Sequence, residues 1–240
     1  MKLLKVSLVA SSLLFSMLSL AQTADEIINK HIEAIGGKDK INQIKSIEIQ
    51  SSMSVMGNDA PMTTTILNGK AFKNELDFNG TKIVQVVTDK GGWSINPMMG
   101  STTAEAMPDD QFKASKDQIF VGGALLDYAS KGNKAELKGK EKVGNADAYR
   151  IDLTAPDNSV TTYYFDPSTY YLVKAVRTIN MGGNAGETSS IFSDYRKTDF
   201  GYVVPYSIET SLPQGMTMTS TVKKIEINKD VDPKIFDMPK

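Results

Sequence analysis

Cysteine is absent from this 240-residue chain, and histidine occurs only once, as His31. Without thiols the chain has no disulfide, no cysteine nucleophile and no thiolate metal site. A Ser-His-Asp arrangement would depend on His31, which we expect at the surface or boundary of a helix. Walker loops, G-x-S-x-G elbows and H-E-x-x-H pairs are missing from the sequence. We therefore expect no catalytic residue, no metal and no cofactor, and a protein that is not an enzyme.

An excess of charge of either sign is also lacking. Lysine and arginine together number 27, aspartate and glutamate 28, and the formal net charge is −1. The basic residues form no patch, so we expect no nucleic-acid partner. Hydrophobic residues make up 40% of the chain, which suits a globular core and argues against general disorder. No linker or low-complexity stretch interrupts residues 22–240, which we predict to be a single domain.

One apolar run, residues 6–20, stands out in a chain with few others, and a short basic start precedes it. Ser19 and Ala21 supply the small side chains that a signal peptidase reads. We predict that residues 1–21 are a signal peptide, cleaved before Gln22, and that the mature protein is periplasmic. A retained N-terminal anchor is the alternative, although the run is short for a membrane span. No cysteine follows the run, so we expect no lipidation.

Two segments of the chain have helical patterns. Residues 23–35 carry isoleucines at three- and four-residue spacing, and Thr23 and Glu26 have the spacing of a capping box. Residues 109–131 contain a second helical pattern, which a Gly-Gly pair at position 122 divides into two short helices. Strand-like sequence lies on both sides of this pair, so the two helices must bury their apolar faces against the sheet.

The rest of the chain alternates apolar and polar residues between tight turns. Asn68-Gly69 and Asn79-Gly80 each predict a type I′ hairpin turn. Repeated hairpins make the sheet antiparallel, and about 11–12 strands are more than a simple sandwich needs. The fold class that we predict is α+β: a large curved antiparallel sheet, covered by helices on its concave side. An ordinary packed α+β core fits the same pattern equally well.

Methionine and aromatic residues on strands and helices point to an apolar cavity as the candidate site. Flexible thioethers suit an adaptable cavity, although they also fill gaps in ordinary cores. Alternate residues of a strand share one face, so apolar side chains at such positions can form a wall that the helices close. The candidate ligand-binding residues are Phe72, Leu76, Phe78, Trp93, Met98, Met99, Phe112, Ile119, Leu125, Leu126, Tyr149 and Ile151.

Several short motifs together resemble a known family. These are Ala34-Ile35-Gly36-Gly37, Gly92-Trp93, the run Tyr164-Phe165-Asp166-Pro167-Ser168-Thr169-Tyr170-Tyr171-Leu172, and Asp194-Tyr195-Arg196 ahead of Val204-Pro205. In this order the chain resembles the outer-membrane lipoprotein-sorting proteins, the LolA-like and LppX-like periplasmic carriers. The resemblance covers nearly the whole mature chain. It implies an unclosed antiparallel β-barrel covered by helices, with an apolar cavity for acyl chains.

The resemblance also implies a function without chemistry. Such a carrier holds lipid or lipoprotein acyl chains in its cavity under a helical lid and exchanges them with a membrane-associated donor or acceptor protein. We expect the protein to act as a monomer. The alternative from another class is an interaction module that docks a membrane-associated partner and holds no lipid. A cavity of a few hundred cubic ångströms would favour the carrier, and a solidly packed interior the module.

Overall fold

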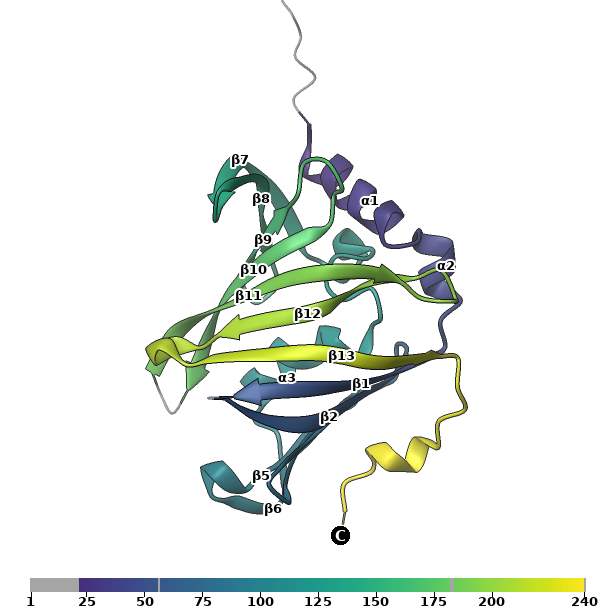
Figure 1. Cartoon of the computed structure of the whole chain (residues 1–240), viewed down its shortest axis with the longest axis vertical. Helices are drawn as coiled ribbons and strands as arrows, with labels where there is room; N and C mark the ends of the chain where they lie inside the picture. The colour runs from purple at the N-terminus through teal and green to yellow at the C-terminus, as the bar shows by residue number, and fades with distance from the viewer. Residues whose placement is uncertain (1–21, 56, 182–183, 240) are drawn as a thin grey trace, which may run out of the picture.

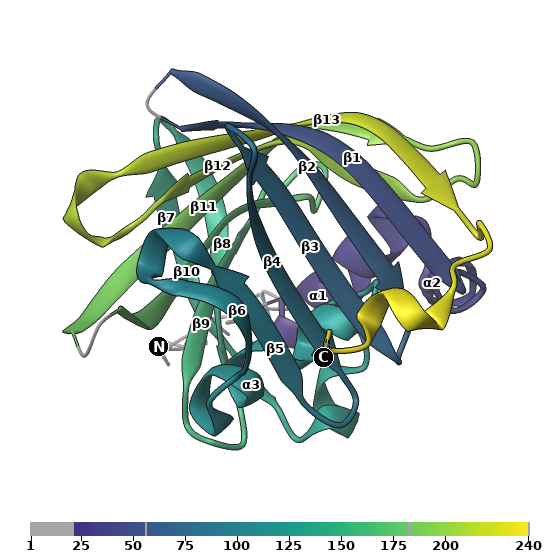
Figure 2. The ribbon, with the colours of Figure 1, turned by 90° about the horizontal axis from the view of Figure 1, so that it is seen from below.

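A single antiparallel sheet organises the computed structural model, which describes residues 22–55, 57–181 and 184–239. The sheet has 13 strands in the order β6-β5-β4-β3-β2-β1-β13-β12-β11-β10-β9-β8-β7, and it is curved and open (Figures 1 and 2). The strands are β1 (Ser46–Val55), β2 (Asn58–Leu67), β3 (Ala71–Phe78), β4 (Thr81–Thr88), β5 (Gly92–Asn96), β6 (Ser101–Ala106), β7 (Lys134–Val143), β8 (Ala146–Thr154), β9 (Val160–Phe165), β10 (Leu172–Met181), β11 (Asn184–Lys197), β12 (Val203–Ser211) and β13 (Thr217–Ile227).

Helical elements are few and short. None of those among the described residues is long and apolar enough to cross a membrane. They comprise α1 (Ala24–Ala34), α2 (Lys38–Asn42), α3 (Asp109–Ser115) and the 3₁₀ turns η1 (Pro97–Met99), η2 (Lys116–Ile119), η3 (Tyr128–Lys131), η4 (Pro213–Gly215) and η5 (Pro233–Phe236). The predicted signal peptide lies outside the described residues, so its cleavage stays a prediction.

The antiparallel sheet is confirmed, and it has one strand more than the sequence pattern indicated. Residues 101–106 form this additional strand, β6, and pair with β5. Their threonines suit an extended backbone, and pairing with an otherwise exposed edge satisfies backbone groups of β5. With β6 included, the sheet is a continuous meander in which β1 also pairs with β13, so that the first and last strands meet near its middle.

This topology determines where the segment between β6 and β7 must run. The two strands stand at opposite ends of the strand order, yet only residues 107–133 connect them. We call these residues the insert. A chain that joins the two edges of a curved sheet has to cross between them, and the insert crosses over the sheet (Figure 2). The position of the insert is therefore a consequence of strand order.

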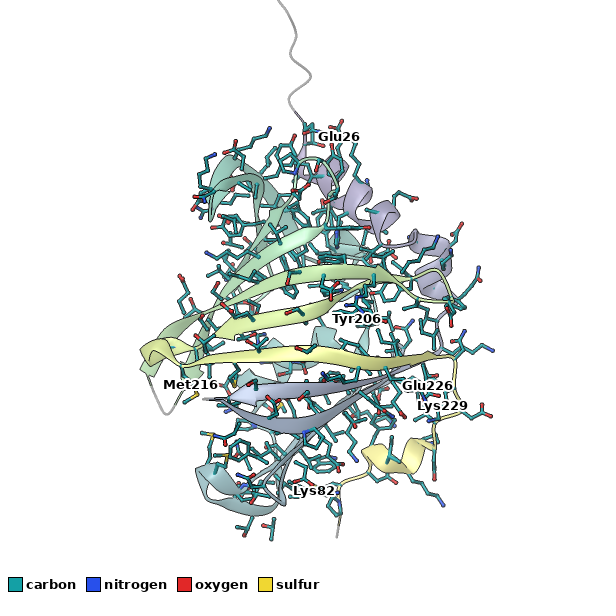
Figure 3. The ribbon with its side chains drawn as sticks, in the orientation of Figure 1. Glu26, Lys82, Tyr206, Met216, Glu226 and Lys229 are labelled. Atoms are coloured by element: carbon teal, nitrogen blue, oxygen red, sulfur yellow. The ribbon has the colours of Figure 1, made fainter. Side chains whose placement is uncertain are left out.

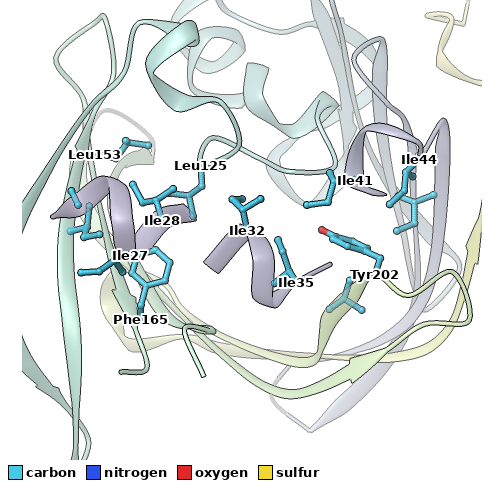
Figure 4. Close-up of a cluster of buried hydrophobic side chains, with 14 residues drawn as sticks. Ile27, Ile28, Ile32, Ile35, Ile41, Ile44, Leu125, Leu153, Phe165 and Tyr202 are labelled. Atoms are coloured by element: carbon cyan, nitrogen blue, oxygen red, sulfur yellow. The ribbon is translucent and has the colours of Figure 1, made fainter. Parts of the chain in front are cut away.

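Helix α1 forms the centre of the main hydrophobic core. The predicted capping box is present, because Thr23 and Glu26 exchange side chain to backbone hydrogen bonds. Ile27 and Ile28 are fully buried and pack in a cluster with Phe165 and other sheet residues (Figure 4). We call the face of the sheet that carries Phe165 the core face. Its other members in this cluster include Ile47, Ile151, Leu153 and Val204.

His31 is buried in this core, which corrects our expectation of a surface or boundary residue. Its ring lies 5.2 Å from the ring of Phe165, between centroids. Nδ1 lies 2.9 Å from the carbonyl oxygen of Tyr170. A carbonyl only accepts hydrogen bonds, so Nδ1 carries the proton of the neutral ring. Burial lowers the pKa of His31 from 6.5 to about 4, against a smaller opposing effect of this hydrogen bond. The helical periodicity did not reveal this because His31 adjoins the apolar stripe of α1.

One of the two predicted hairpin turns differs from the expectation. Asn79 and Gly80 have φ values of 54° and 81° and join β3 to β4 in two residues, as a type I′ turn requires. The connection from β2 to β3 instead has three residues, 68–70. The side chain of Asn68 makes a tertiary contact there: its amide donates a hydrogen bond to the carbonyl of Ile44 at 2.8 Å.

The insert is less helical than its pattern predicted. Helix α3 and η2 form the first half, but the predicted second helix is a series of turns that ends in η3. Gly123 and Asp127 have positive φ values of 58° and 53°, which interrupt a helix. The chain is also tightly folded here, since a Cβ on Gly122 would lie 2.4 Å from the Cβ of Leu126. The Gly-Gly pair thus produces a compact turn instead of a helix boundary.

Candidate ligand cavity

A cavity of about 590 Å³ lies between the insert and the core face of strands β9 to β13. Its volume falls within the range of about 300–1,000 Å³ that is typical of small-molecule sites. Alternate residues of β9, β10 and β11 line it, as Ala175, Arg177 and Ile179 do from β10. The insert contributes residues between Ala114 and Ala124. The cavity therefore exists because the insert spans the sheet without filling the space beneath it.

The cavity lining is amphipathic. Aromatic and aliphatic side chains come from both the insert and the sheet, and hydroxyl groups come from β9, β11 and β12. The apolar group includes Phe120, Val121, Ala175, Ile179, Phe192, Leu212 and Met218, and the hydroxyl group consists of Thr161, Thr188, Ser190 and Thr210. Some of the hydroxyls are already used: Thr188 donates to the backbone carbonyl of Ser211 at 3.0 Å, and Ser190 and Thr210 lie 3.0 Å apart.

Two charged side chains line the cavity, one from the sheet and one from the insert. Arg177 stands on β10, and Asp117 stands on the insert in η2. Tyr163 of β9 also lines the cavity, and burial raises the pKa of its phenol to about 12. The negative charge of Asp117 raises the pKa of Tyr163 further, whereas the positive charge of Arg177 lowers it. Tyr163 is thus a neutral hydroxyl at neutral pH, influenced by opposite charges from two directions.

Two side chains fix the insert to the sheet beside the cavity. The side-chain oxygen of Asn68 accepts a hydrogen bond from the backbone N–H of Val121 at 3.0 Å. The hydroxyl of the buried Tyr202 donates to the carbonyl of the same Val121 at 3.1 Å. The backbone adds a third contact, from the N–H of Gly69 to the carbonyl of Ile119 at 2.8 Å. Residues 119–121 are therefore the anchor of the insert.

A half-buried lysine holds the next turn of the insert in place. Lys131 Nζ donates to the carbonyl of Gly123 at 2.5 Å and lies 4.5 Å from the centre of the Phe120 ring. Both contacts close the loop formed by residues 120–131 on itself. Burial lowers the pKa of Lys131, partly offset by Asp117 and Asp127. The loop that roofs the cavity is thus stabilised by contacts within itself as well as by its anchor.

Asn68→Ala should loosen this roof. The substitution removes the acceptor of the Val121 N–H and the donor to the Ile44 carbonyl, and loss of such hydrogen bonds costs about 1–3 kcal/mol. We expect faster amide hydrogen exchange at residues 119–126, measured by mass spectrometry, with the strands β9 to β11 unchanged. Asn79→Ala, in the other hairpin, is the matched control and should leave exchange in the insert as it is. Unchanged exchange at residues 119–126 in Asn68→Ala would show that this side chain does not anchor the roof.

A second, smaller hollow of about 480 Å³ lies beside α1. Ile28 and Ile32 of α1 line it together with Leu125 and Leu126 of the insert. Its rim is polar, with the ion pair from Lys38 to Asp127 and a hydrogen bond from the Tyr128 hydroxyl to Asp25. These contacts join α1 and the start of α2 to the insert, so this hollow lies at the seam between the two helical segments.

The structure brings some of the sequence-predicted site residues together and separates others. Ile151 of β8 and Leu125 belong to the hydrophobic core around α1, and Tyr149 and Leu126 pack against that core. Phe72, Leu76 and Phe78 alternate along β3, on the same face as Ile66 and Met62, to which Phe72 and Leu76 are paired. Ile66 packs against the α1 core, so this is the core face. Ile119 is buried within the insert, and Phe112 is half-buried on α3.

Trp93, Met98 and Met99 lie apart from this group. Trp93 packs in a second cluster with Ala71, Val84 and Phe236, and its indole N–H donates to the carbonyl of Phe236 at 2.9 Å. The C-terminal turn η5 thus covers the face of β3 to β5 that is opposite to Phe72. Met98 and Met99 are 66% and 71% exposed in η1. None of the twelve predicted residues is among the described residues that line the larger cavity. Their role in ligand binding stays a prediction.

The residues that do line the larger cavity gave a different signal in the sequence. On β10 and β11 they alternate as Ala175, Arg177, Ile179 and as Thr188, Ser190, Phe192, and half of these six side chains are small or carry a hydroxyl. Small side chains on a strand leave space in front of it, whereas most of the predicted ligand-binding residues are large and apolar. Among the described residues, no three His, Asp or Glu side chains come together as a metal site would require.

Comparison with known proteins identifies the fold. The chain superposes on a LolA superfamily protein of Nitrosomonas europaea with a TM-score of 0.59 and 14% identity, over 90% of this chain and 98% of the other. A DUF1329 family protein of Desulfovibrio piger gives 0.60 and 14%, over 89% and 97%. A putative outer membrane lipoprotein-sorting protein domain of Vibrio parahaemolyticus gives 0.58 and 14%, over 89% and 97%.

These likenesses define a class of structure: the chain has the LolA-like fold, as the resemblance in its sequence implied. At 14% identity the likeness is one of fold alone, and the chain is a divergent example of it. No protein-family model matches the sequence, and no curated protein is significantly similar to it.

Proposed function

We propose that this protein is a periplasmic carrier that binds the acyl chains of a lipid or lipoprotein without catalysis. The observation that carries the proposal is the cavity of about 590 Å³ between the insert and the core face of the sheet. In this view the insert and α1 cover the concave side of the curved sheet, and the insert is the lid. The LolA-like fold supports the proposal, because a solved protein with this fold is described as a lipoprotein-sorting domain.

The energetics of such a site are favourable. Each CH₂ group removed from water contributes about 0.8 kcal/mol, so a cavity wall with Ile179, Phe192 and Met218 can hold an acyl chain. Residues 119–121 attach the roof to the sheet, and its later part is joined to α1 and α2 through Asp127, Tyr128 and the buried Leu125. The Lys38–Asp127 pair is exposed, so this roof can open to admit and release a chain once a few surface contacts break.

Mass spectrometry of an organic extract tests the proposal directly. The protein is purified from its native periplasm without detergent, and the extract is compared with that of an equally purified exported protein of similar size. We expect one amphiphile in an amount stoichiometric with the protein. An empty extract, together with no uptake of a fluorescent fatty acid by the purified protein, would overturn the carrier assignment.

The interaction module is the second candidate, and exposed methionines favour it. Exposed methionines occur on η1, as Met98 and Met99, and after η4, as Met216. Met216 marks the end of the β12–β13 hairpin, at the opposite end of the sheet from Glu226 and Lys229 (Figure 3). Flexible apolar side chains on such loops suit contact with a membrane-associated donor or acceptor. An empty cavity with an intact partner contact would select this candidate.

A further inference from the structure

The larger cavity contains one cationic and one anionic side chain with no counter-ion in contact. Arg150 and Arg196 are each paired with neighbouring carboxylates, at 3.1 Å and 2.6 Å. In the part of the chain that the structure describes, Arg177 takes part in no ion pair, and neither does Asp117. Both line the cavity, Arg177 from β10 and Asp117 from the insert. They therefore present opposite charges from different walls to whatever occupies the space between them.

Tyr163 lies within electrostatic range of both charges and lines the same cavity. Both act on its phenol, with opposite sign, so both lie within electrostatic range of the same hydroxyl. They remain more than a salt-bridge distance apart, since no pair between them occurs among the described residues. The neutral hydroxyl of Tyr163 can donate a hydrogen bond toward an anion or accept one from a cation. The cavity thus has a cation on the β10 wall, an anion on the insert, and a neutral hydroxyl within electrostatic range of both.

This arrangement discriminates between ligand headgroups. A purely apolar ligand in the cavity would displace water from the half-buried Asp117 and from the cavity side of Arg177 without replacing its hydrogen bonds, which is unfavourable. An anionic headgroup would satisfy Arg177 but would leave Asp117 desolvated and repelled, and a cationic headgroup would do the reverse. A headgroup that carries both charges satisfies both walls. The apolar part of the lining is left to hold a hydrocarbon chain.

We propose that the cavity recognises an amphiphile with a zwitterionic headgroup, whose phosphate or carboxylate contacts Arg177 and whose ammonium group contacts Asp117. This inference rests on the proposed function and specifies the class of ligand for that same site. The headgroup lies toward the solvent, because Arg177 is an exposed residue. The chain extends along the apolar residues of β10, β11 and the insert.

Four ligands with the same twelve-carbon chain test the proposal by calorimetry, each below its micelle concentration. They are dodecylphosphocholine, dodecyl phosphate, dodecyltrimethylammonium and dodecanol. We expect dodecylphosphocholine to bind at least tenfold more tightly than the other three. Equal affinities for all four would overturn the headgroup assignment and leave the carrier function standing. Binding of none of the four, with an empty native extract, would overturn both. Free phosphocholine binding as tightly as dodecylphosphocholine would also overturn the proposal, since the chain would then contribute nothing.

Single substitutions assign each charge to its side of the headgroup. R177Q should lower affinity for dodecylphosphocholine at least tenfold and make dodecyltrimethylammonium the preferred ligand. D117N should shift the preference toward dodecyl phosphate. R150Q is the matched control: Arg150 belongs to β8 but pairs with Glu141 outside the cavity lining, and its removal should leave all four affinities unchanged. The same order of affinities in wild type, R177Q and D117N would overturn the proposal. If one of the two variants does not fold, the other still tests the proposal.

Discussion

Ala175→Trp should abolish the binding of a fluorescent fatty acid while the protein remains folded. Ala175 lies on the core face of β10, between its strand partners Tyr163 and Ser190, and all three line the larger cavity. A tryptophan there replaces a methyl group with an indole in the space that the ligand needs. Each CH₂ group of the fatty acid that the indole excludes from the cavity lowers the binding free energy by about 0.8 kcal/mol. A tenfold loss of affinity corresponds to about 1.4 kcal/mol, so the exclusion of several CH₂ groups weakens binding more than tenfold.

The control for this prediction is on the same strand. Thr178→Trp adds the same side chain to β10, but Thr178 is exposed on the opposite face and is not among the cavity residues. It should bind the probe like the wild type. Titration followed by probe fluorescence measures the affinity, and far-ultraviolet circular dichroism verifies the sheet in both variants. Unchanged binding in a folded Ala175→Trp would place the ligand elsewhere, for instance in the hollow between α1 and Leu126.

The sheet could be predicted from the sequence because the patterns that indicate its strands and turns are local. Alternation of apolar and polar residues gives each strand, and turn residues such as Asn79-Gly80 give the connections. The capping box of Thr23 and Glu26 similarly fixes the start of α1 within the sequence that forms it. The one strand that the sequence did not predict, β6, is a short edge strand of threonines and small residues, in which apolar and polar side chains do not alternate. Its formation depends on pairing with β5, which is not a local property.

The cavity could not be predicted from the sequence in the same way, because it depends on contacts between distant segments. Strand periodicity shows that Phe72, Leu76 and Phe78 share a face, but it does not show which part of that face the insert covers. Trp93 has an equally apolar strand position, yet the C-terminal residue Phe236 packs against it on the opposite face. The space near Ala175 arises from small side chains beneath the insert. Large apolar side chains fill the space around them, so they mark packed regions of the sheet and not hollow ones.

Lowering the pH from 7 to 5 should destabilise the wild-type protein by about 2 kcal/mol through His31 alone. In the folded protein burial lowers the pKa of His31 to about 4, whereas the unfolded chain has the ordinary value of 6.5. Between these values the unfolded state binds a proton that the folded state does not, so the free energy of unfolding decreases as the pH falls. The slope approaches about 1.4 kcal/mol per pH unit and the effect is complete near pH 4.

His31→Gln isolates this contribution, because glutamine does not titrate and His31 is the only histidine. Urea unfolding at pH 7, 6 and 5 should give a falling free energy for the wild type and a nearly level one for the variant. The carboxylates with lowered pKa, such as Asp166 and Glu75, lose their stabilising effect only at lower pH and do so in both proteins. Parallel curves for the two proteins would mean that His31 is solvated and charged in the folded state, and that α1 does not seal the core at Phe165.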